Sequence, residues 1–378
     1  MKRIAAFLLA LFATSAFSED LPEHFIKRYE GTLDGKMGIT VMLAGNGEEV
    51  SGTYYYHRKG MPIELTGSIS VMGKIDMKES TYNADGDEVV TGIWNINTTE
   101  DGSLRGTWKA SNNAKPLALT LKEMYPAGSI PTVVTNLTYS SKKGRDGEEL
   151  GVSRECQYVQ FQSTSPAATA INAKLRQHVI EPMLTVEDDA DGKPIARPVK
   201  TPTAAEIEAL VYQPANKEDE DWEAAYVNET ITSMEVIFNE RNFLCIKSNY
   251  YEYSGGAHGN HGAGYYVFSL KTGEELTLKN LLKPGYEKSF TKLGEADLKV
   301  QASVQPDAPL HDAGLSIDAL ELTDNWFVNA GGIGFSYSPY EIASYARGYV
   351  VFTLPWKDIQ SWIDTASPLR PLIPINTK

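Results

Sequence analysis

Cysteine is scarce in this sequence, and long apolar runs are almost absent. Two cysteines among 378 residues exclude a disulfide-dense scaffold, an iron–sulfur protein and a zinc site made of cysteines. Beyond the first residues no segment approaches about 18 continuous apolar residues, so we expect no membrane span once that start is removed. Hydrophobic residues still make up 42% of the chain, which is enough for a packed interior and too many for disorder.

Positive charge is also in short supply. The chain has 35 Lys and Arg residues against 49 Asp and Glu residues, a formal net charge of −14. A chain with this excess of acidic residues is not expected to bind nucleic acid or anionic lipid electrostatically. The sequence also lacks the serine-hydrolase elbow, the zinc-protease helix motif, the P-loop and the dinucleotide fingerprint. We therefore expect no nucleic-acid partner and no cofactor.

The N-terminal residues have the composition of a signal peptide. Lys2 and Arg3 precede an apolar run over 4–12, and residues 16–18 (Ala-Phe-Ser) fit a small-x-small cleavage site. We expect residues 1–18 to be cleaved, giving a periplasmic or secreted protein with no lipid anchor, since no cysteine lies near the cleavage point. Loss of the two positive charges leaves a net charge of −16.

Export to an oxidising compartment favours pairing of the two cysteines. Cys156 and Cys245 both stand in strand-like sequence, and cysteines on adjacent strands meet the short separation that a disulfide needs. We expect a disulfide between them, which would close a loop of about 90 residues and stabilise the fold by roughly 4 kcal/mol. Two buried free thiols are the alternative.

Residues 19–124 read as short strands separated by turns. Turn signals such as Asp34-Gly35 and Asp101-Gly102 punctuate the segment, and no helical period interrupts it. This pattern predicts an all-β antiparallel meander, closed or nearly closed into a calycin-like barrel. The expected strands lie at 25–33, 37–43, 49–57, 62–70, 73–79, 88–97, 103–110 and 116–123.

A glycine stands two residues before a large apolar residue in four of these strands: Gly52 before Tyr54, Gly67 before Ile69, Gly92 before Trp94 and Gly106 before Trp108. Alternation puts both members of each pair on one face of the strand. The glycine leaves room for a neighbouring aromatic ring or lets the strand bend sharply. The barrel then either holds a small ligand or is filled by its own aromatic side chains, and we favour the filled interior.

Residues 125–131, rich in Pro and Gly, are expected to link the barrel to a second domain over 132–378. In that domain Ser165-Pro166 opens a helix whose buried face carries Ile171, Leu175 and Val179. Strands alternate with this and later helices, which predicts an α+β domain with an antiparallel sheet and helices on one face. Three later helices are expected. The first begins at Thr201-Pro202, the next presents Tyr286, Phe290, Leu293 and Val300 along one face, and the closing helix carries Trp356, Ile359 and Ile363.

The densest set of chemistry-bearing side chains follows residue 250. Tyr253, His258 and His261 lie in or beside a glycine-rich turn. Two histidines three residues apart could bind a metal or act as acid–base groups near neutral pH, or they could only hydrogen-bond the backbone of a tight turn. Between two later strands, Tyr340 and Tyr345 could stack on a sugar or a protein partner, or simply cover the end of the sheet.

These motifs resemble a known domain. Ser-Gly-Gly-Ala-His at 254–258, Lys-Thr-Gly at 271–273 and Pro-Tyr-Glu-Ile-Ala at 339–343, followed by Gly348, are similar to the extracytoplasmic domain shared by RsiV-type anti-sigma factors and PdaC-type peptidoglycan deacetylases, outside the catalytic part of the latter. The resemblance covers about 130 to 365 and leaves out the N-terminal barrel.

The resemblance implies a binding or sensing module with an α+β fold, which in RsiV-type proteins binds lysozyme. It does not imply deacetylase activity, because the metal-dependent deacetylase domain has no counterpart in this sequence. We therefore expect an exported, non-enzymatic binding or sensing protein of the cell envelope, with peptidoglycan or a lysozyme-like protein as ligand; a charge of −16 would attract cationic lysozyme. The alternatives are a hydrolase that uses His258 or His261 and a carrier of small ligands in the barrel.

Overall fold

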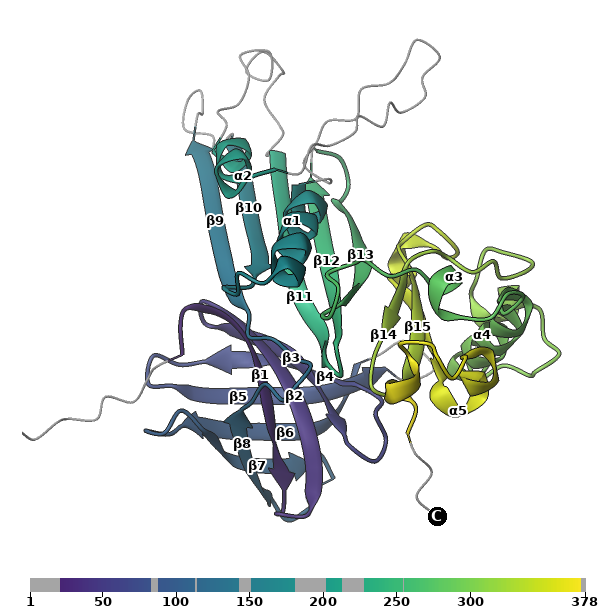
Figure 1. The fold of residues 1–378 in the computed structure, drawn as a ribbon, viewed down its shortest axis with the longest axis horizontal. Helices are drawn as coiled ribbons and strands as arrows, with labels where there is room; N and C mark the ends of the chain where they lie inside the picture. The colour runs from purple at the N-terminus through teal and green to yellow at the C-terminus, as the bar shows by residue number, and fades with distance from the viewer. Residues whose placement is uncertain are drawn as a thin grey trace, which may run out of the picture.

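A computed structural model describes residues 21–82, 88–112, 114–142, 151–180, 202–212, 228–253 and 255–374. The expected signal peptide lies outside these residues. The described chain forms a β-barrel, a five-stranded sheet beside it and a three-stranded sheet with short helices (Figure 1).

Eight antiparallel strands form the closed barrel, and β1 pairs with both β2 and β8. The predicted barrel is confirmed, and the expected strand ends differ from the observed ones by at most three residues. The strands are β1 (His24–Leu33), β2 (Met37–Asn46), β3 (Glu49–Tyr56), β4 (Ile63–Ile69), β5 (Lys74–Tyr82), β6 (Glu88–Thr98), β7 (Leu104–Ala110) and β8 (Leu117–Glu123).

The glycines of the repeat make room in two ways. A Cβ on Gly106 would lie 1.9 Å from the backbone oxygen of Asn95, so glycine there lets neighbouring strands approach closely. A Cβ on Gly92 would lie 2.6 Å from Trp108 Nε1 and from the carboxyl carbon of Glu79, so glycine there admits side chains. Tyr54 and Trp94, each at most 1% exposed, help to fill the barrel, as expected for an interior packed by its own aromatic residues.

The five-stranded sheet has the order β13-β12-β11-β10-β9. Three of its four strand pairings are antiparallel, as expected, but β10 and β11 are parallel. A parallel pair needs a crossover, and the helices α1 (Pro166–Ile180) and α2 (Ala204–Val211) lie in that connection. The strands are β9 (Val133–Lys142), β10 (Gly151–Gln160), β11 (Asn228–Glu240), β12 (Phe243–Tyr253) and β13 (Asn260–Ser269).

The helices α1 and α2 cover one face of this sheet (Figure 1). Ile171, Leu175 and Val179 are fully buried in the core between α1 and the sheet, as their spacing predicts. The Asn172 amide accepts a hydrogen bond from the Phe161 backbone N–H and donates one to the Phe161 carbonyl, both at 2.9 Å, which fixes α1 to the end of β10. Within the described ranges, no helix is long and apolar enough to span a membrane.

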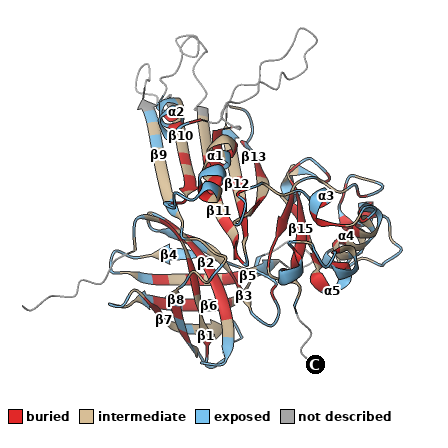
Figure 2. Ribbon diagram, viewed as in Figure 1, coloured by how far each residue is buried: buried red, intermediate tan, exposed pale blue. Residues whose placement is uncertain are grey.

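The three-stranded sheet packs against the other face of the five-stranded sheet. All six residues of β15 are buried (Figure 2), and the core around them includes Phe243, Cys245 and Val267 from β12 and β13. The elements are α3 (Leu278–Leu281), α4 (Glu287–Gln301), β14 (Trp326–Val328), β15 (Gly332–Tyr337), β16 (Val350–Pro355) and the one-turn helix α5 (Trp356–Ile359).

The buried face of α4 is the expected one except at its end. Tyr286 and Phe290 are buried and Leu293 packs partly buried against the core, but Val300 is 74% exposed and the helix also buries Gly294 and Leu298. A Cβ on Gly294 would lie 2.6 Å from the Phe352 ring, so α4 packs closely on β16 at this glycine. A glycine adds nothing to a hydrophobic pattern, so the sequence does not indicate this contact.

The expected disulfide is wrong. Cys156 lies on β10 and Cys245 on β12, with β11 between them, and both are buried free cysteines. Two strand spacings amount to about 10 Å, beyond the reach of a disulfide. The thiols also face opposite sides, because Cys156 packs in the core under α1 and Cys245 in the core of the three-stranded sheet. Burial raises the pKa of Cys156 to about 11 and that of Cys245 to about 12.

A buried ion pair joins the barrel to the five-stranded sheet. Arg28 of β1 is 1% exposed and donates to Glu240 at the end of β11 (2.9 Å), to Glu30 (2.8 Å) and to the Met124 carbonyl (2.8 Å). The Tyr55 hydroxyl of β3 also donates to Glu240, at 2.8 Å. Burial lowers the pKa of Arg28, but hydrogen bonds to Glu30 and Glu240 outweigh it and raise the pKa overall, so the guanidinium is charged.

Candidate functional site

Two segments about 80 residues apart in sequence meet beside β13. The first is the turn between β12 and β13, and the second is the 338–349 connection between β15 and β16. Asn325 helps to hold the two sheets together at this point: its amide accepts from the Tyr265 N–H (2.8 Å) and donates to the carbonyls of Ala263 (2.8 Å) and Ser336 (3.0 Å).

The rings of these segments form a contiguous cluster, here called the His–Tyr surface: His258, His261, Tyr340, Tyr345 and Tyr349. His258 stacks on Tyr345 with ring centroids 4.0 Å apart and planes at 22°. His261 meets Tyr345 edge-on at 5.2 Å and Tyr349 at 5.4 Å. Tyr340 lies 5.4 Å from Tyr345, tilted by 35°. The structure therefore brings together four of the five residues that the sequence singled out.

Tyr253, the fifth, contacts its own turn. Its hydroxyl donates to the Gly256 carbonyl at 3.1 Å. In the part of the chain that the structure describes, no hydrogen bond or ring contact joins it to the other four residues. Tyr253 thus supports the turn rather than the surface.

Hydrogen bonds set the orientation of both histidine rings. The Tyr345 hydroxyl donates to the Gly259 carbonyl (2.8 Å), so its oxygen can accept from Nδ1–H of His261, 3.2 Å away. Nδ1 of His258 donates to the same carbonyl at 2.8 Å. Its Nε2 then remains as an acceptor, 3.5 Å from the Tyr340 hydroxyl. We assign these tautomers from the partners of each nitrogen.

Tyr340 has a backbone conformation that is unfavourable for its residue type. Its φ is +72°, in the left-handed region, while its side chain is 61% exposed. Buried Pro339 and Ile342 anchor the turn on either side, and the Glu341 carboxylate accepts a 2.5 Å hydrogen bond from the Ser338 N–H. The turn thus holds a large apolar ring in solvent at the expense of local strain, which is a feature of functional sites.

Tyr349 and Lys247 extend the surface and were missed from the sequence. The Lys247 ammonium lies 5.7 Å from the Tyr349 ring centre and 3.5 Å from the Glu235 carboxylate. Burial, and then the nearby Tyr250 and Glu235, raise the pKa of Tyr349 to about 12, so its hydroxyl stays protonated at neutral pH. Tyr349 follows Tyr345 by four residues, but in a chain with 20 tyrosines that spacing does not distinguish a surface ring from a core ring.

Within the described residues, the contacts of the two histidines are with tyrosines and the backbone. Among the described residues, no three His, Cys, Asp or Glu side chains are placed to hold a metal ion. His258 and His261 bond a backbone carbonyl and tyrosine hydroxyls instead of a carboxylate that would orient a catalytic base. The described side chains place ring faces beside hydroxyl groups and an acceptor nitrogen.

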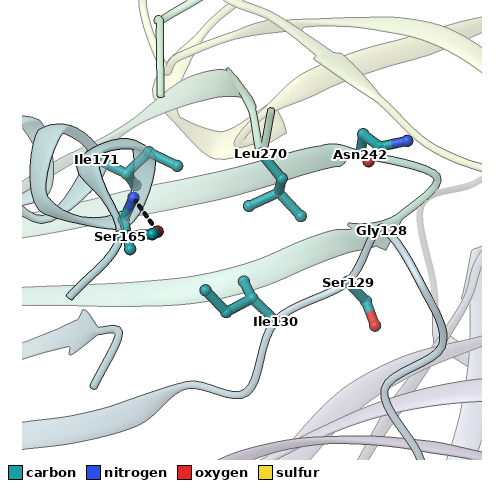
Figure 3. A pocket seen from close by; sticks show the side chains of 8 residues that line it. Gly128, Ser129, Ile130, Ser165, Ile171, Asn242 and Leu270 are labelled. Atoms are coloured by element: carbon teal, nitrogen blue, oxygen red, sulfur yellow. Dashed lines mark hydrogen bonds between the residues drawn. The ribbon is translucent and has the colours of Figure 1, made fainter. Parts of the chain in front are cut away.

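A separate cavity of about 220 Å³ lies beside the N-terminus of α1, and Figure 3 shows the residues that line it. The side chains of Ile130, Ile171 and Leu270 converge on it, and Ser129, Ser165 and Asn242 complete the lining. Because the lining is uncharged and the volume is below the roughly 300 Å³ of common ligand pockets, we do not assign it a role.

The fold is thus an α+β domain joined to a closed barrel, and two segments of the α+β part match known families. Residues 279–357 match the family described as a protein of unknown function (DUF3298), and residues 152–261 match the deacetylase PdaC. These matches confirm the predicted resemblance to a domain of unknown function shared with PdaC-type proteins. The His–Tyr surface contains residues of both segments. Its histidines lie in the 152–261 segment and its tyrosines in the 279–357 segment.

Two solved structures are similar to this chain. A DUF3298 family member from Bacteroides fragilis is 19% identical and covers 66% of this chain and 99% of its own, with a TM-score of 0.49. A DUF3298 family protein from Pseudomonas aeruginosa PAO1 is 17% identical and covers 65% and 98%, with a TM-score of 0.47. No curated protein matches the chain.

Proposed function

We propose that this chain is an exported, non-enzymatic binding protein of the cell envelope, and that its His–Tyr surface binds the glycan strands of peptidoglycan. The observation that carries the proposal is the exposed Tyr340 ring, held out by a turn at positive φ and backed by Tyr345 and His258. A ring fixed before binding loses little conformational entropy when a ligand packs on it.

The chemistry of the surface suits a sugar. The C–H face of a pyranose packs on an aromatic ring, whose face carries partial negative charge. Around Tyr340, sugar hydroxyls would find the Tyr340 hydroxyl and the acceptor nitrogen of His258. The stacked pair of His258 and Tyr345 gives the platform a rigid base.

The N-terminal sequence supports an exported location. Cleavage of residues 1–18 after export would place the protein in the periplasm or outside the cell, where peptidoglycan lies. The resemblance of about 130–365 to a domain that accompanies peptidoglycan deacetylases supports the same ligand.

A lysozyme-like protein is the ligand that the site supports less well. The net charge of −16 expected after export would attract a cationic protein at long range. The described charges at and beside the rings, however, are Lys247 and Arg347 against Glu235 and Glu341, which balance. Contact chemistry therefore favours a neutral, hydroxyl-rich ligand.

Co-sedimentation with purified, insoluble peptidoglycan tests the proposal. We expect the wild-type protein to pellet with it and Tyr340→Ala to bind about tenfold more weakly, since loss of one stacked ring removes on the order of 1–2 kcal/mol. Tyr212→Ala is the matched control, because Tyr212 is an exposed tyrosine at the end of α2 (42%) and should bind as wild type. Binding to immobilised lysozyme but not to peptidoglycan would contradict the proposed ligand.

A further inference from the structure

The five-stranded sheet has two edges, and the described chain covers only one of them. At β13 the Asn325 amide accepts from the Tyr265 N–H (2.8 Å) and donates to the Ala263 carbonyl (2.8 Å). Further along the same edge, the Leu276 N–H donates to the Val267 carbonyl at 2.7 Å. β9 is the last strand on the opposite side (Figure 1), and among the described residues no backbone hydrogen bond reaches its outer edge.

β9 also lacks the features that keep an exposed edge from pairing. Residues 132–141 contain no charged residue and no proline, so the edge is uncharged up to its last residue, Lys142. The strand pairs with β10 over all of its 10 residues without a bulge. Proteins commonly protect an edge with charges, proline, a bulge or a covering segment. Because every second residue of an edge strand directs its N–H and C=O outward, β9 is a template for another strand.

The barrel flanks only the start of β9. The Thr132 hydroxyl donates to the Ile26 carbonyl (3.0 Å), and the Asn136 amide donates to Nε2 of His24 (3.2 Å). Within the described ranges, no hydrogen bond joins the barrel to β9 beyond Asn136. Residues 137–142 are therefore the open part of the edge, which is long enough for about six backbone hydrogen bonds with an antiparallel partner.

The side chains of this open part suit pairing of the strand with itself. Leu137 and Tyr139 are partly buried on the face under α1 and α2, whereas Thr138 and Ser140 are exposed on the other face. A two-fold axis perpendicular to the sheet brings like faces together, so hydroxyl groups meet hydroxyl groups and apolar side chains meet apolar side chains. The uncharged edge also lets two acidic copies approach each other.

We propose that two copies of this chain pair through β9, antiparallel about a two-fold axis near Tyr139, so that one sheet runs through both. A two-fold interface, in which each copy presents the same surface, is the commonest arrangement of homodimers. A short strand pair is smaller than the roughly 1,200 Å² that stable interfaces bury, so the dimer dissociates on dilution. The His–Tyr surface lies beside β13, at the opposite edge, so pairing leaves it open and gives the dimer two such surfaces.

Sedimentation equilibrium of the chain without residues 1–18 tests the proposal. Measurements run from about 1 to about 100 µM in about 0.15 M salt, which screens the repulsion between acidic copies. We expect a monomer–dimer equilibrium, together with slower hydrogen–deuterium exchange of β9 at the higher concentration.

Thr138→Glu is expected to weaken the dimer about tenfold, because it brings like charges together across the axis. Thr138→Lys should weaken it in the same way, and an equal mixture of the two variants should associate again, which a folding defect would not allow. Thr66→Glu is the matched control, since Thr66 is an exposed threonine on β4 of the barrel, and it should dimerise as wild type.

Two results would overturn the proposal. A wild-type chain that stays monomeric at the highest concentration would leave the β9 edge to a strand of another protein. A dimer that Thr138→Glu does not weaken would show that the copies meet elsewhere.

Discussion

At the scale of single residues, Arg28 shows what a sequence pattern conceals. It stands at a position of β1 that alternation assigns to the outer face, where an arginine would normally meet solvent. Its partner Glu240 lies 212 residues away, and nothing local in either segment indicates that the other exists. The pair becomes visible only when the barrel and the sheet are placed side by side.

Replacement of Arg28 by Ala is expected to destabilise the protein by about 3 kcal/mol, because the buried Glu240 carboxylate then keeps only the half-exposed Arg241, 3.5 Å away, as a counter-charge. Lys27→Ala is the control: Lys27 lies on the same strand and pairs with Glu123, but both side chains are partly exposed (28% and 35%), so we expect a loss of about 1 kcal/mol or less. Urea unfolding measures both. Equal losses for the two variants would contradict the importance of the buried pair.

The two cysteines give a second test at this scale. Denatured, unreduced protein should release two thiols to a colorimetric reagent, and native protein at pH 8 should release essentially none, because Cys156 and Cys245 are buried with raised pKa values. The folded state favours the neutral thiols, so their contribution to stability is complete below the usual pKa of 9 and declines as pH rises towards 11–12. An absence of free thiols in the denatured protein would contradict this and would show that the two cysteines form a disulfide.

At the scale of elements, the barrel was predictable because its signals are local. Most strands alternate, six of the seven connections between consecutive strands carry a glycine, and an antiparallel meander pairs mainly neighbours along the chain. The parallel pairing of β10 with β11 was not predictable, because it depends on how α1 and α2 cross the sheet. The exposure of Val300 was not predicted. Gly294 lies at the centre of the packed face of α4, and a glycine carries no hydrophobic signal.

Asn325 is the residue on which the junction between β13 and β15 depends. Asn325→Ala leaves one backbone N–H and two carbonyls without partners, so we expect a loss of about 2–3 kcal/mol in the free energy of unfolding. Asn112→Ala, in an exposed turn, should change it by less than about 0.5 kcal/mol. A small effect of Asn325→Ala in urea unfolding would show that the two sheets are held together by their apolar core alone.

At the scale of the whole molecule, contacts between the barrel and the two sheets join the described chain into one assembly. Besides Arg28 and Glu240, the Thr132 hydroxyl bonds the Ile26 carbonyl (3.0 Å), and a Cβ on Gly60 would lie 2.6 Å from the Ala330 carbonyl oxygen. The barrel therefore contacts both sheets. The expected linker is itself tied down, since the Gly128 carbonyl accepts from the Asn242 N–H at 2.7 Å.

We accordingly expect one cooperative thermal transition for the wild-type protein, and two resolved transitions for Arg28→Ala if the barrel then unfolds separately. Differential scanning calorimetry measures this. Two transitions already in the wild type would mean that the contacts across the barrel do not couple the two parts.

The His–Tyr surface also belongs to this scale. The sequence singled out four of its residues from two separate motifs, but it could not show that segments about 80 residues apart meet, nor that Tyr253 turns away. That knowledge comes from the packing of the two sheets around Asn325.

Hydrogen–deuterium exchange with soluble peptidoglycan fragments tests the central claim most directly. The account predicts slower exchange in peptides covering the 255–264 turn and the 338–349 connection when fragments are added, with α2 unchanged as an internal control, and loss of this protection in Tyr340→Ala. Protection elsewhere on the chain with none in these two segments would contradict it.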